Sequence, residues 1–164
     1  MAPKVLVGGI GNIFLGDDAF GVEVAVRLAR LPMPNNVKVV DFGIRSYDLA
    51  FALMDEWDLV ILVDALPNGG APGTLYVLEP ELSQTSELPA IDAHTMNPVG
   101  VLDLVRRMGG GLSRLMVVGC EPESVEPGQS GKFDLTPLVA AAVPEAMCLV
   151  EKLIISAQNK AAAA

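Results

Sequence analysis

Gly8-Gly9-Ile10-Gly11-Asn12-Ile13-Phe14-Leu15-Gly16-Asp17-Asp18-Ala19-Phe20-Gly21 is the stretch that indicates the fold of this chain. It follows an apolar run at residues 4–10 and leads into an amphipathic segment, which is typical of the first strand-to-helix turn of an α/β domain. Such turns usually bind phosphate, because glycines expose backbone N–H groups and the helix N-terminus carries a positive potential. Here Asp17 and Asp18 stand at the helix entrance and would repel a phosphate. The turn therefore predicts a cation as its ligand.

Length and composition indicate one acidic domain. The chain has 164 residues, of which 51% are hydrophobic, and a mean hydropathy of +0.45, as expected for a sheet covered on both faces. The net charge of -9 argues against a nucleic-acid partner, and no apolar run approaches the roughly 18–20 residues that span a bilayer. Two cysteines and no signal-peptide pattern predict a cytoplasmic protein. We expect one domain at residues 1–158, followed by a disordered tail or cloning remnant at 159–164.

Strand and helix signals alternate along the chain and predict a three-layer α/β/α sandwich with a mixed, mostly parallel sheet. Strands are expected at residues 4–10, 37–41, 59–63, 74–78 and 114–119. Helices are expected at residues 19–31, 47–55, 97–108 and from 136 onward. Too few residues separate the third and fourth strands for a crossover helix, so the fourth should run antiparallel. Pro144 should kink or divide the last helix.

Acidic residues follow several of these strands. Asp17 and Asp18 come after the first strand, Asp41 ends the second and Asp64 ends the third. Open α/β sheets bind ligands beyond the carboxyl ends of their parallel strands, and carboxylates that share a site need a cation or raised pKa values. Together with the single histidine, His94, two of these acids would suit an open site for a divalent metal.

Each candidate also has a structural interpretation. Asp17 is well explained as an N-cap or first-turn acid that interacts with the helix dipole, whereas Asp18 exceeds what capping requires. Asp41 fits turn chemistry or the site, and both alternatives stay open. Asp64 could cap a turn, although its place at the ligand-binding edge favours a function, and a lone loop histidine is by itself a weak signal. Cys120 is expected to be a small buried residue.

Four segments resemble, in order, those of the maturation endopeptidases of nickel–iron hydrogenases. They are Gly9-Ile10-Gly11-Asn12-Ile13-Phe14-Leu15-Gly16-Asp17-Asp18, Val63-Asp64-Ala65, Asp92-Ala93-His94-Thr95-Met96-Asn97-Pro98 and Val118-Gly119-Cys120-Glu121-Pro122. The resemblance extends over residues 5–153. It implies a five-stranded α/β/α sandwich that removes a C-terminal extension from a hydrogenase large-subunit precursor after nickel insertion.

The resemblance also implies the site. Its three metal-contacting positions fall on Asp18, Asp64 and His94, and these are the candidate catalytic residues of an aspartate-based peptidase. The metal would be nickel supplied by the substrate, with no organic cofactor. Relatives often carry an Asp-Gly-Gly-Thr-like segment where this chain has Asp41-Phe42-Gly43-Ile44-Arg45, so Asp41 and Asn12 are candidate substrate-binding residues. We expect a monomer that binds neither nucleic acid nor membrane.

Other functions remain open at this point. A self-contained metallohydrolase of a small substrate would use the same three ligands with a tightly held metal. A non-enzymatic nickel-binding maturation factor would bind the metal without proteolysis. A nucleotide-binding domain is disfavoured, because the turn lacks the third glycine of a dinucleotide fingerprint and the Lys-Ser/Thr of a P-loop.

Overall fold

The computed structural model describes residues 1–80, 98–126 and 134–163. In chain order its elements are β1 (Val5–Ile10), the short 3-10 helix η1 (Gly16–Ala19), α1 (Phe20–Leu28), β2 (Val37–Gly43), α2 (Ser46–Ala52), β3 (Leu59–Ala65), β4 (Leu75–Leu78), α3 (Pro98–Arg107), β5 (Leu115–Cys120) and α4 (Pro137–Ala163). The five strands form one sheet in the order β2-β1-β3-β5-β4. β4 runs antiparallel to β5, whereas the other three neighbouring pairs are parallel. The predicted mixed, mostly parallel sheet is confirmed.

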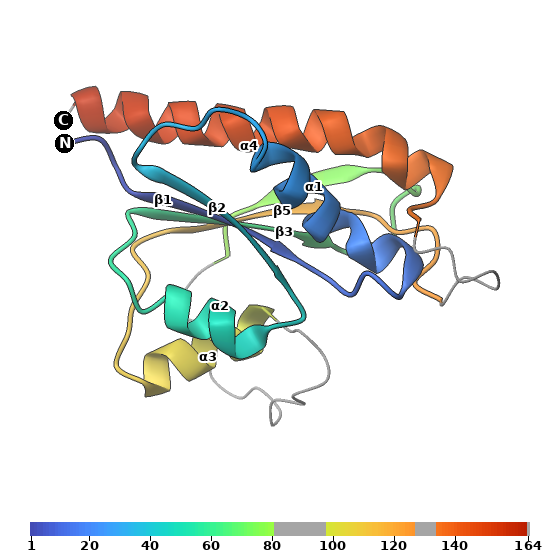
Figure 1. Ribbon diagram of the computed structural model, residues 1–164, viewed down its shortest axis with the longest axis horizontal. Helices are drawn as coiled ribbons and strands as arrows, with labels where there is room; N and C mark the ends of the chain where they lie inside the picture. The colour runs from blue at the N-terminus through green and yellow to red at the C-terminus, as the bar shows by residue number, and fades with distance from the viewer. Residues whose placement is uncertain (81–97, 127–133, 164) are drawn as a thin grey trace.

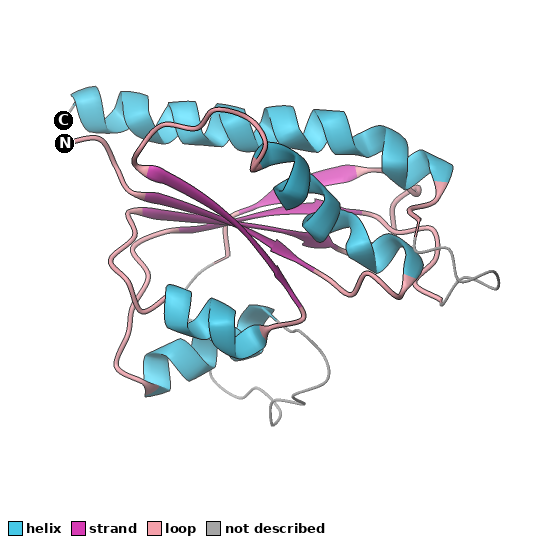
Figure 2. Ribbon diagram, viewed as in Figure 1, coloured by secondary structure: helices cyan, strands magenta, loops and turns pink. Residues whose placement is uncertain are grey.

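Helices cover both faces of this sheet, α1 and α4 on one side and α2 and α3 on the other (Figures 1 and 2). Because successive side chains of a strand point to opposite faces, neighbouring residues enter different cores. Val7 and Ile61 belong to the apolar cluster under α1 and α4, while Leu6 and Leu62 belong to the cluster under α2 and α3. The central strands are therefore buried on both faces, which explains the high hydropathy of the chain.

Helix α4 is continuous over 27 residues, so of the two predicted effects of Pro144, a kink or a division, the division is wrong. Pro144 is exposed, and buried residues pack against the sheet on both sides of it; these are Val139, Ala142, Val143, Ala146, Val150 and Ile154. This packing holds the two parts of the helix together in spite of the backbone hydrogen bond that proline removes. Residues 159–163, for which the sequence predicts a disordered tail, are helical in the structure.

Two boundaries that differ from the sequence prediction affect the site. β3 continues through Ala65 rather than ending at residue 63, so Asp64 belongs to the strand itself. The glycine-rich turn winds into η1 before α1 begins at Phe20, so Asp17 and Asp18 lie in a short 3-10 helix. Within the described residues, no helix combines the length and apolar character needed to cross a membrane.

Helix α1 lies directly on the sheet because Gly9 and Gly21 have no side chains. A Cβ at Gly21 would overlap the carbonyl oxygens of Ile10 and Val63, and a Cβ at Gly9 would overlap the carbonyl of Gly21. Only glycine permits so close an approach of helix and strand backbones. The contact brings η1, and with it Asp18, against the end of β3.

We expect Gly21→Ala to lower the free energy of unfolding by roughly 1–3 kcal/mol, because the added methyl group must push α1 away from β1 and β3. Gly111→Ala is the control, since a Cβ there meets no atom within 4 Å. Urea unfolding followed by circular dichroism measures both changes. Equal stability of the two variants would contradict the close contact.

Candidate functional site

The connections that follow β1 and β3 lead to opposite faces of the sheet. α1, which follows β1, covers one face, and α3, the next helix after β3, covers the other (Figure 1). β1 and β3 are parallel neighbours, so this is a switch point at which open α/β sheets bind ligands beyond the carboxyl ends of the strands. Asp18 follows β1 and Asp64 lies near the end of β3. The structure thus places two predicted site residues on either side of the switch point.

The glycine-rich turn folds back on itself and holds Asp18 in place. The Oδ2 atom of Asp18 accepts a hydrogen bond of 2.8 Å from the backbone N–H of Asn12. Gly11 has a φ of +141°, and the carbonyl of Asp18 occupies the space that a Cβ of Gly11 would need. The side chain of Asn12 stabilises the same turn, because its Oδ1 accepts a 2.9 Å hydrogen bond from the N–H of Phe14.

Asp64 has a strongly perturbed carboxyl group. Its burial raises the pKa from the ordinary 3.8 to about 8, the negative charge of Asp18 adds to this rise, and a hydrogen bond from the N–H of Ala65 opposes it. Desolvation and a like charge both disfavour the ionised form. Asp64 therefore holds a proton near neutral pH unless a cation replaces it. A strongly raised carboxyl pKa at the ligand-binding edge of a sheet is typical of functional sites.

The third predicted ligand, His94, lies outside the described residues. Among the residues that the structure does describe, no three His, Cys, Asp or Glu side chains are grouped closely enough to hold a metal ion. The described part of the site therefore consists of Asp18 and Asp64. The two are linked because the charge of Asp18 raises the pKa of Asp64.

Asp41 lies near the end of β2, in register with Gly9 of β1. Its Oδ1 atom is buried, and no described residue donates a hydrogen bond to it. Such an acceptor is costly to bury without a partner, so it is available to a group that enters the site. Asp41 thus has a buried acceptor without a described partner, in addition to its place in the turn.

The residues after Asp41 build the turn that leads into α2. Phe42 is buried, and a Cβ at Gly8 would lie 3.0 Å from its ring. The guanidinium group of Arg45 donates to the backbone carbonyls of Asp41 and Phe42, with 3.1 Å from Nε to the Phe42 oxygen, and also contacts Asp48 at 3.3 Å. Phe42 and Arg45 therefore have local structural roles in this turn.

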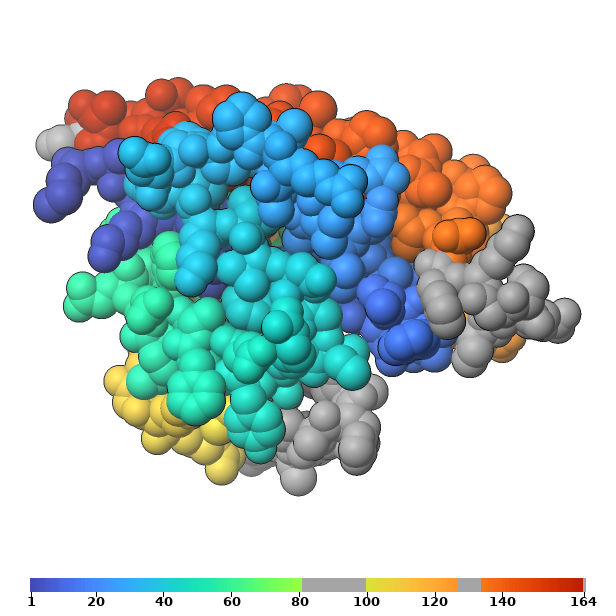
Figure 3. All heavy atoms as spheres, viewed as in Figure 1, coloured from blue at the N-terminus to red at the C-terminus, as the bar shows by residue number. Residues whose placement is uncertain are grey.

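A hollow of about 270 Å³ lies between the glycine-rich turn and the turn after β2. Its lining includes Asn12, Ile13, Phe14, Asp41, Ile44 and Arg45. Ile13, Phe14 and Ile44 are large apolar residues with exposed fractions of 44%, 54% and 51%. Figure 3 shows the segments after β1 and after β2 beside each other at the surface. An apolar hollow thus lies beside the turn that holds Asp18, with Asp41 among its lining residues.

Asp17 has a structural role, as the sequence predicts, but its partners lie outside the helix that it is expected to cap. Its side chain is completely buried and accepts hydrogen bonds from residues 123, 124 and 136. Position 136 directly precedes α4, so Asp17 contacts the start of α4 instead of capping its own helix. No sequence pattern predicts this contact, because the two segments are more than 100 residues apart.

Glu121 is a second buried acid with a structural role, one that the sequence analysis did not assign. It accepts hydrogen bonds from the N–H groups of Asn68 at 2.8 Å and Gly69 at 3.3 Å, and from the hydroxyl of Tyr76 at 2.8 Å. Burial alone would raise the pKa of Glu121, but these hydrogen bonds outweigh it and lower the pKa. Glu121 therefore fixes the connection between β3 and β4, which begins just after Asp64.

Cys120 is buried, as predicted. Burial, with the charges of Asp17 and Glu121, raises the pKa of its thiol to about 11. The thiol is therefore neutral at physiological pH and unsuited to act as a nucleophile.

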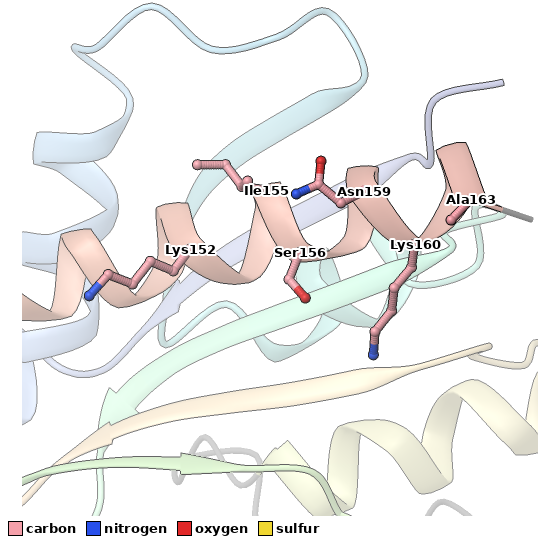
Figure 4. Close-up of a pocket in the computed structure, with 6 residues that line it drawn as sticks. All are labelled: Lys152, Ile155, Ser156, Asn159, Lys160 and Ala163. Carbon is pink, nitrogen blue, oxygen red and sulfur yellow. The ribbon is translucent and has the colours of Figure 1, made fainter.

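A hollow on the outer side of α4 lacks the features of a site. Six residues line it: Lys152, Ile155, Ser156, Asn159, Lys160 and Ala163 (Figure 4). Ile155 and Asn159 point to one side of the helix, whereas Ser156 and Lys160 point to the other. These side chains do not converge on a common point, so we place the candidate site at the switch point.

Comparisons with known proteins show the family of this chain. The family model described as "Hydrogenase maturation protease" matches residues 22–153. The chain belongs to this family. It is thus a peptidase, and the family match includes Asp41 and Asp64 but begins after Asp18.

Individual relatives are similar over most of the chain. The hydrogenase 2 maturation protease of Escherichia coli is 33% identical over 150 residues, which cover 88% of this chain and 86% of that protein. The solved structure of the hydrogenase maturating endopeptidase HybD from Escherichia coli has a TM-score of 0.76 at 31% identity, with 93% of each chain covered. A hydrogenase 2 maturation peptidase from a Thaumarchaeota archaeon has a TM-score of 0.70 at 29% identity, covering 92% of this chain and 97% of its own. The sandwich is therefore the fold of these endopeptidases.

The raised pKa of Asp64 predicts the pH dependence of stability. The carboxyl group titrates at about 8 in the folded protein but near 3.8 when unfolded, so the unfolded chain releases its proton first. The wild-type protein should therefore lose stability as the pH rises from about 4 to about 8. Asp64→Asn removes this loss, and we expect the variant to unfold at a higher temperature than wild type at pH 8.

Thermal unfolding across this pH range, in a buffer with a chelator, measures the difference. Asp55→Asn changes an exposed acid at the other end of β3 and serves as the control. If wild type and Asp64→Asn showed the same pH dependence, the proposed burial of the Asp64 charge would be incorrect.

Proposed function

We propose that this protease removes a C-terminal extension from a hydrogenase large-subunit precursor, and that it recognises nickel held by the precursor. Family membership supports the reaction class, and the names of the relatives connect them with hydrogenase maturation. The observation that carries the proposal is the pair of coupled carboxyl groups, Asp18 and Asp64, at the switch point of the sheet.

The electrostatics of the pair favour a cation as the group recognised. Two acids at one desolvated position repel each other, and a divalent cation relieves both the repulsion and the cost of desolvation. As the cation approaches, Asp64 gives up its proton and becomes a ligand. Two carboxylates with one imidazole from His94 form an incomplete set of ligands, which suits a nickel ion that the substrate already coordinates. We therefore assign Asp18, Asp64 and His94 as the nickel-contacting residues.

The same residues are suited to peptide hydrolysis. The reaction requires a base that makes a water molecule nucleophilic, and an acid that protonates the departing amine. Once the cation has displaced the proton of Asp64, this carboxylate is ionised and can serve as the base. We assign the proton transfers to the set Asp18, Asp64 and His94.

We also propose that the hollow beside the carboxylate pair receives the substrate peptide. In this proposal the Oδ1 of Asp41, which has no described partner, accepts a hydrogen bond from a peptide N–H. Ile13 and Ile44 offer apolar surface to a substrate side chain, and Asn12 shapes the turn between the hollow and Asp18. Asn12 and Asp41 thus contribute to substrate binding.

We expect the purified protein to trim a nickel-loaded large-subunit precursor and to leave a nickel-free precursor intact. Asp18→Asn, Asp64→Asn and His94→Ala should each reduce trimming by at least roughly a hundredfold, because each removes a ligand or proton-transfer group. Asp55→Asn, at the other end of β3, should retain activity. Gel shifts and mass spectrometry of the precursor measure the cleavage. Normal trimming by all three site variants would overturn the site assignment.

The source of the metal predicts the metal content of the free protein. If the substrate supplies nickel, protein purified without added metal should contain far less than one metal ion per chain. Inductively coupled plasma mass spectrometry of the purified protein measures this content. One tightly held zinc ion per chain would instead favour a self-contained metallohydrolase with the same ligands.

A further inference from the structure

Asp17 forms a cluster of hydrogen bonds that the proposed reaction does not use. One oxygen, Oδ2, accepts from the N–H of Glu123 at 2.8 Å, the N–H of Ser124 at 3.0 Å and the hydroxyl of Thr136 at 2.9 Å. The other oxygen accepts from the N–H of Thr136 at 2.7 Å. None of the ion pairs among the described residues includes Asp17. A completely buried carboxylate is therefore stabilised by four hydrogen bonds, with no countercharge from the described residues.

The backbone strengthens the same connection. The N–H of Asp17 donates a 2.9 Å hydrogen bond to the carbonyl of Ser124, whose own N–H binds the Asp17 side chain. Gly16 has a φ of +54°, and a Cβ at this position would lie 2.8 Å from the Ser124 oxygen. The glycine thus allows the two backbones to approach. Asp17 therefore both donates to and accepts from the segment after β5. It also accepts from Thr136, which directly precedes α4.

Asp18 lies directly between this cluster and the glycine-rich turn. On one side Asp17 is fixed by Glu123, Ser124 and Thr136; on the other, the Asp18 carboxylate binds the N–H of Asn12. A dihedral change at Asp17 would therefore move Asp18 relative to β3. Nothing in the fold of α1 requires an acid at position 17, since its carboxylate makes no cap to its own helix.

We propose that Asp17 is a positioning residue of this protease: it binds the segment after β5 and the start of α4, and so fixes Asp18 opposite Asp64. The proposal rests on the proposed function of Asp18. Asp17 contacts neither substrate nor metal; it acts through its neighbour. Catalytic geometry that is fixed by supporting hydrogen bonds is sensitive to their loss, because small displacements of a ligand reduce activity strongly.

Hydrogen exchange at the Asn12 amide provides a direct test, because this N–H binds Asp18. Asp17→Asn replaces one acceptor oxygen with a donor, so at least one N–H or O–H then faces another donor. We expect protection of the Asn12 amide to fall roughly tenfold or more, relative to amides of β3 in the same protein. Val150→Ala removes packing on α4 away from this cluster. It should leave the ratio of Asn12 protection to β3 protection unchanged.

Thr136 offers a milder pair of variants if Asp17→Asn does not fold. Thr136→Val loses the hydroxyl that binds Oδ2, whereas Thr136→Ser keeps it. We expect Thr136→Val to lower Asn12 protection severalfold and Thr136→Ser to retain it, although no hydrogen bond described here joins Thr136 to Asn12. Unchanged Asn12 protection in both Asp17→Asn and Thr136→Val would overturn the proposal.

Trimming of the nickel-loaded precursor separates this proposal from the proposed function. We expect Asp17→Asn to reduce trimming at least tenfold at a temperature at which circular dichroism shows it folded, while Val150→Ala remains active. Full activity of Asp17→Asn, with wild type active, would overturn the positioning role alone. A wild-type protein that leaves the precursor intact would overturn the proposed function, while the exchange measurement would still report on Asp17.

Discussion

The contact of α1 with the carboxyl ends of β1 and β3 is the constraint on which the site depends. Gly21 lies against the carbonyl oxygens of Ile10 and Val63, so helix and strands meet backbone to backbone. Because the helix is so close, the residues just before it lie over the switch point of the sheet rather than out in solvent. A larger residue at position 21 would move Asp18 away from Asp64 and weaken their coupling. The packing of one glycine therefore controls the electrostatics of the site.

The acids at this edge of the sheet fall into two groups by their hydrogen bonding. Asp17 and Glu121 are buried and accept four and three hydrogen bonds, which satisfy their charges and fix the surrounding connections. Asp64 is destabilised in its ionised form by burial and by Asp18, and Asp41 keeps a buried oxygen without a described partner. The first group stabilises the fold. The second reduces stability, and such a cost is expected where a site must receive a charged or polar group.

The sequence predicted the class of fold, the order of the strands along the chain and the antiparallel fourth strand, because these follow from hydrophobic patterns and connection lengths. It also placed Asp18 and Asp64 at one edge, since parallel strands share their carboxyl ends. It failed at Pro144, where tertiary packing holds a helix together that local propensity would divide. It failed again for Asp17, whose partners at Ser124 and Thr136 depend on a contact between distant segments. His94 lies outside the described residues, so its place at the site stays a prediction.

Asp17 and Asp18 show why neighbouring identical residues can have opposite roles. A buried carboxylate is tolerated either when donors surround it or when a cation can reach it. At position 17 the donors come from the chain itself, and they leave no room for a ligand. At position 18 the described residues supply one N–H, from Asn12, and the neighbouring Asp64 disfavours a second ionised carboxyl group, so a cation would add the stabilisation that the described donors do not provide. The number of donors that the fold provides to each acid, rather than the acid's identity, therefore separates the structural aspartate from the functional one.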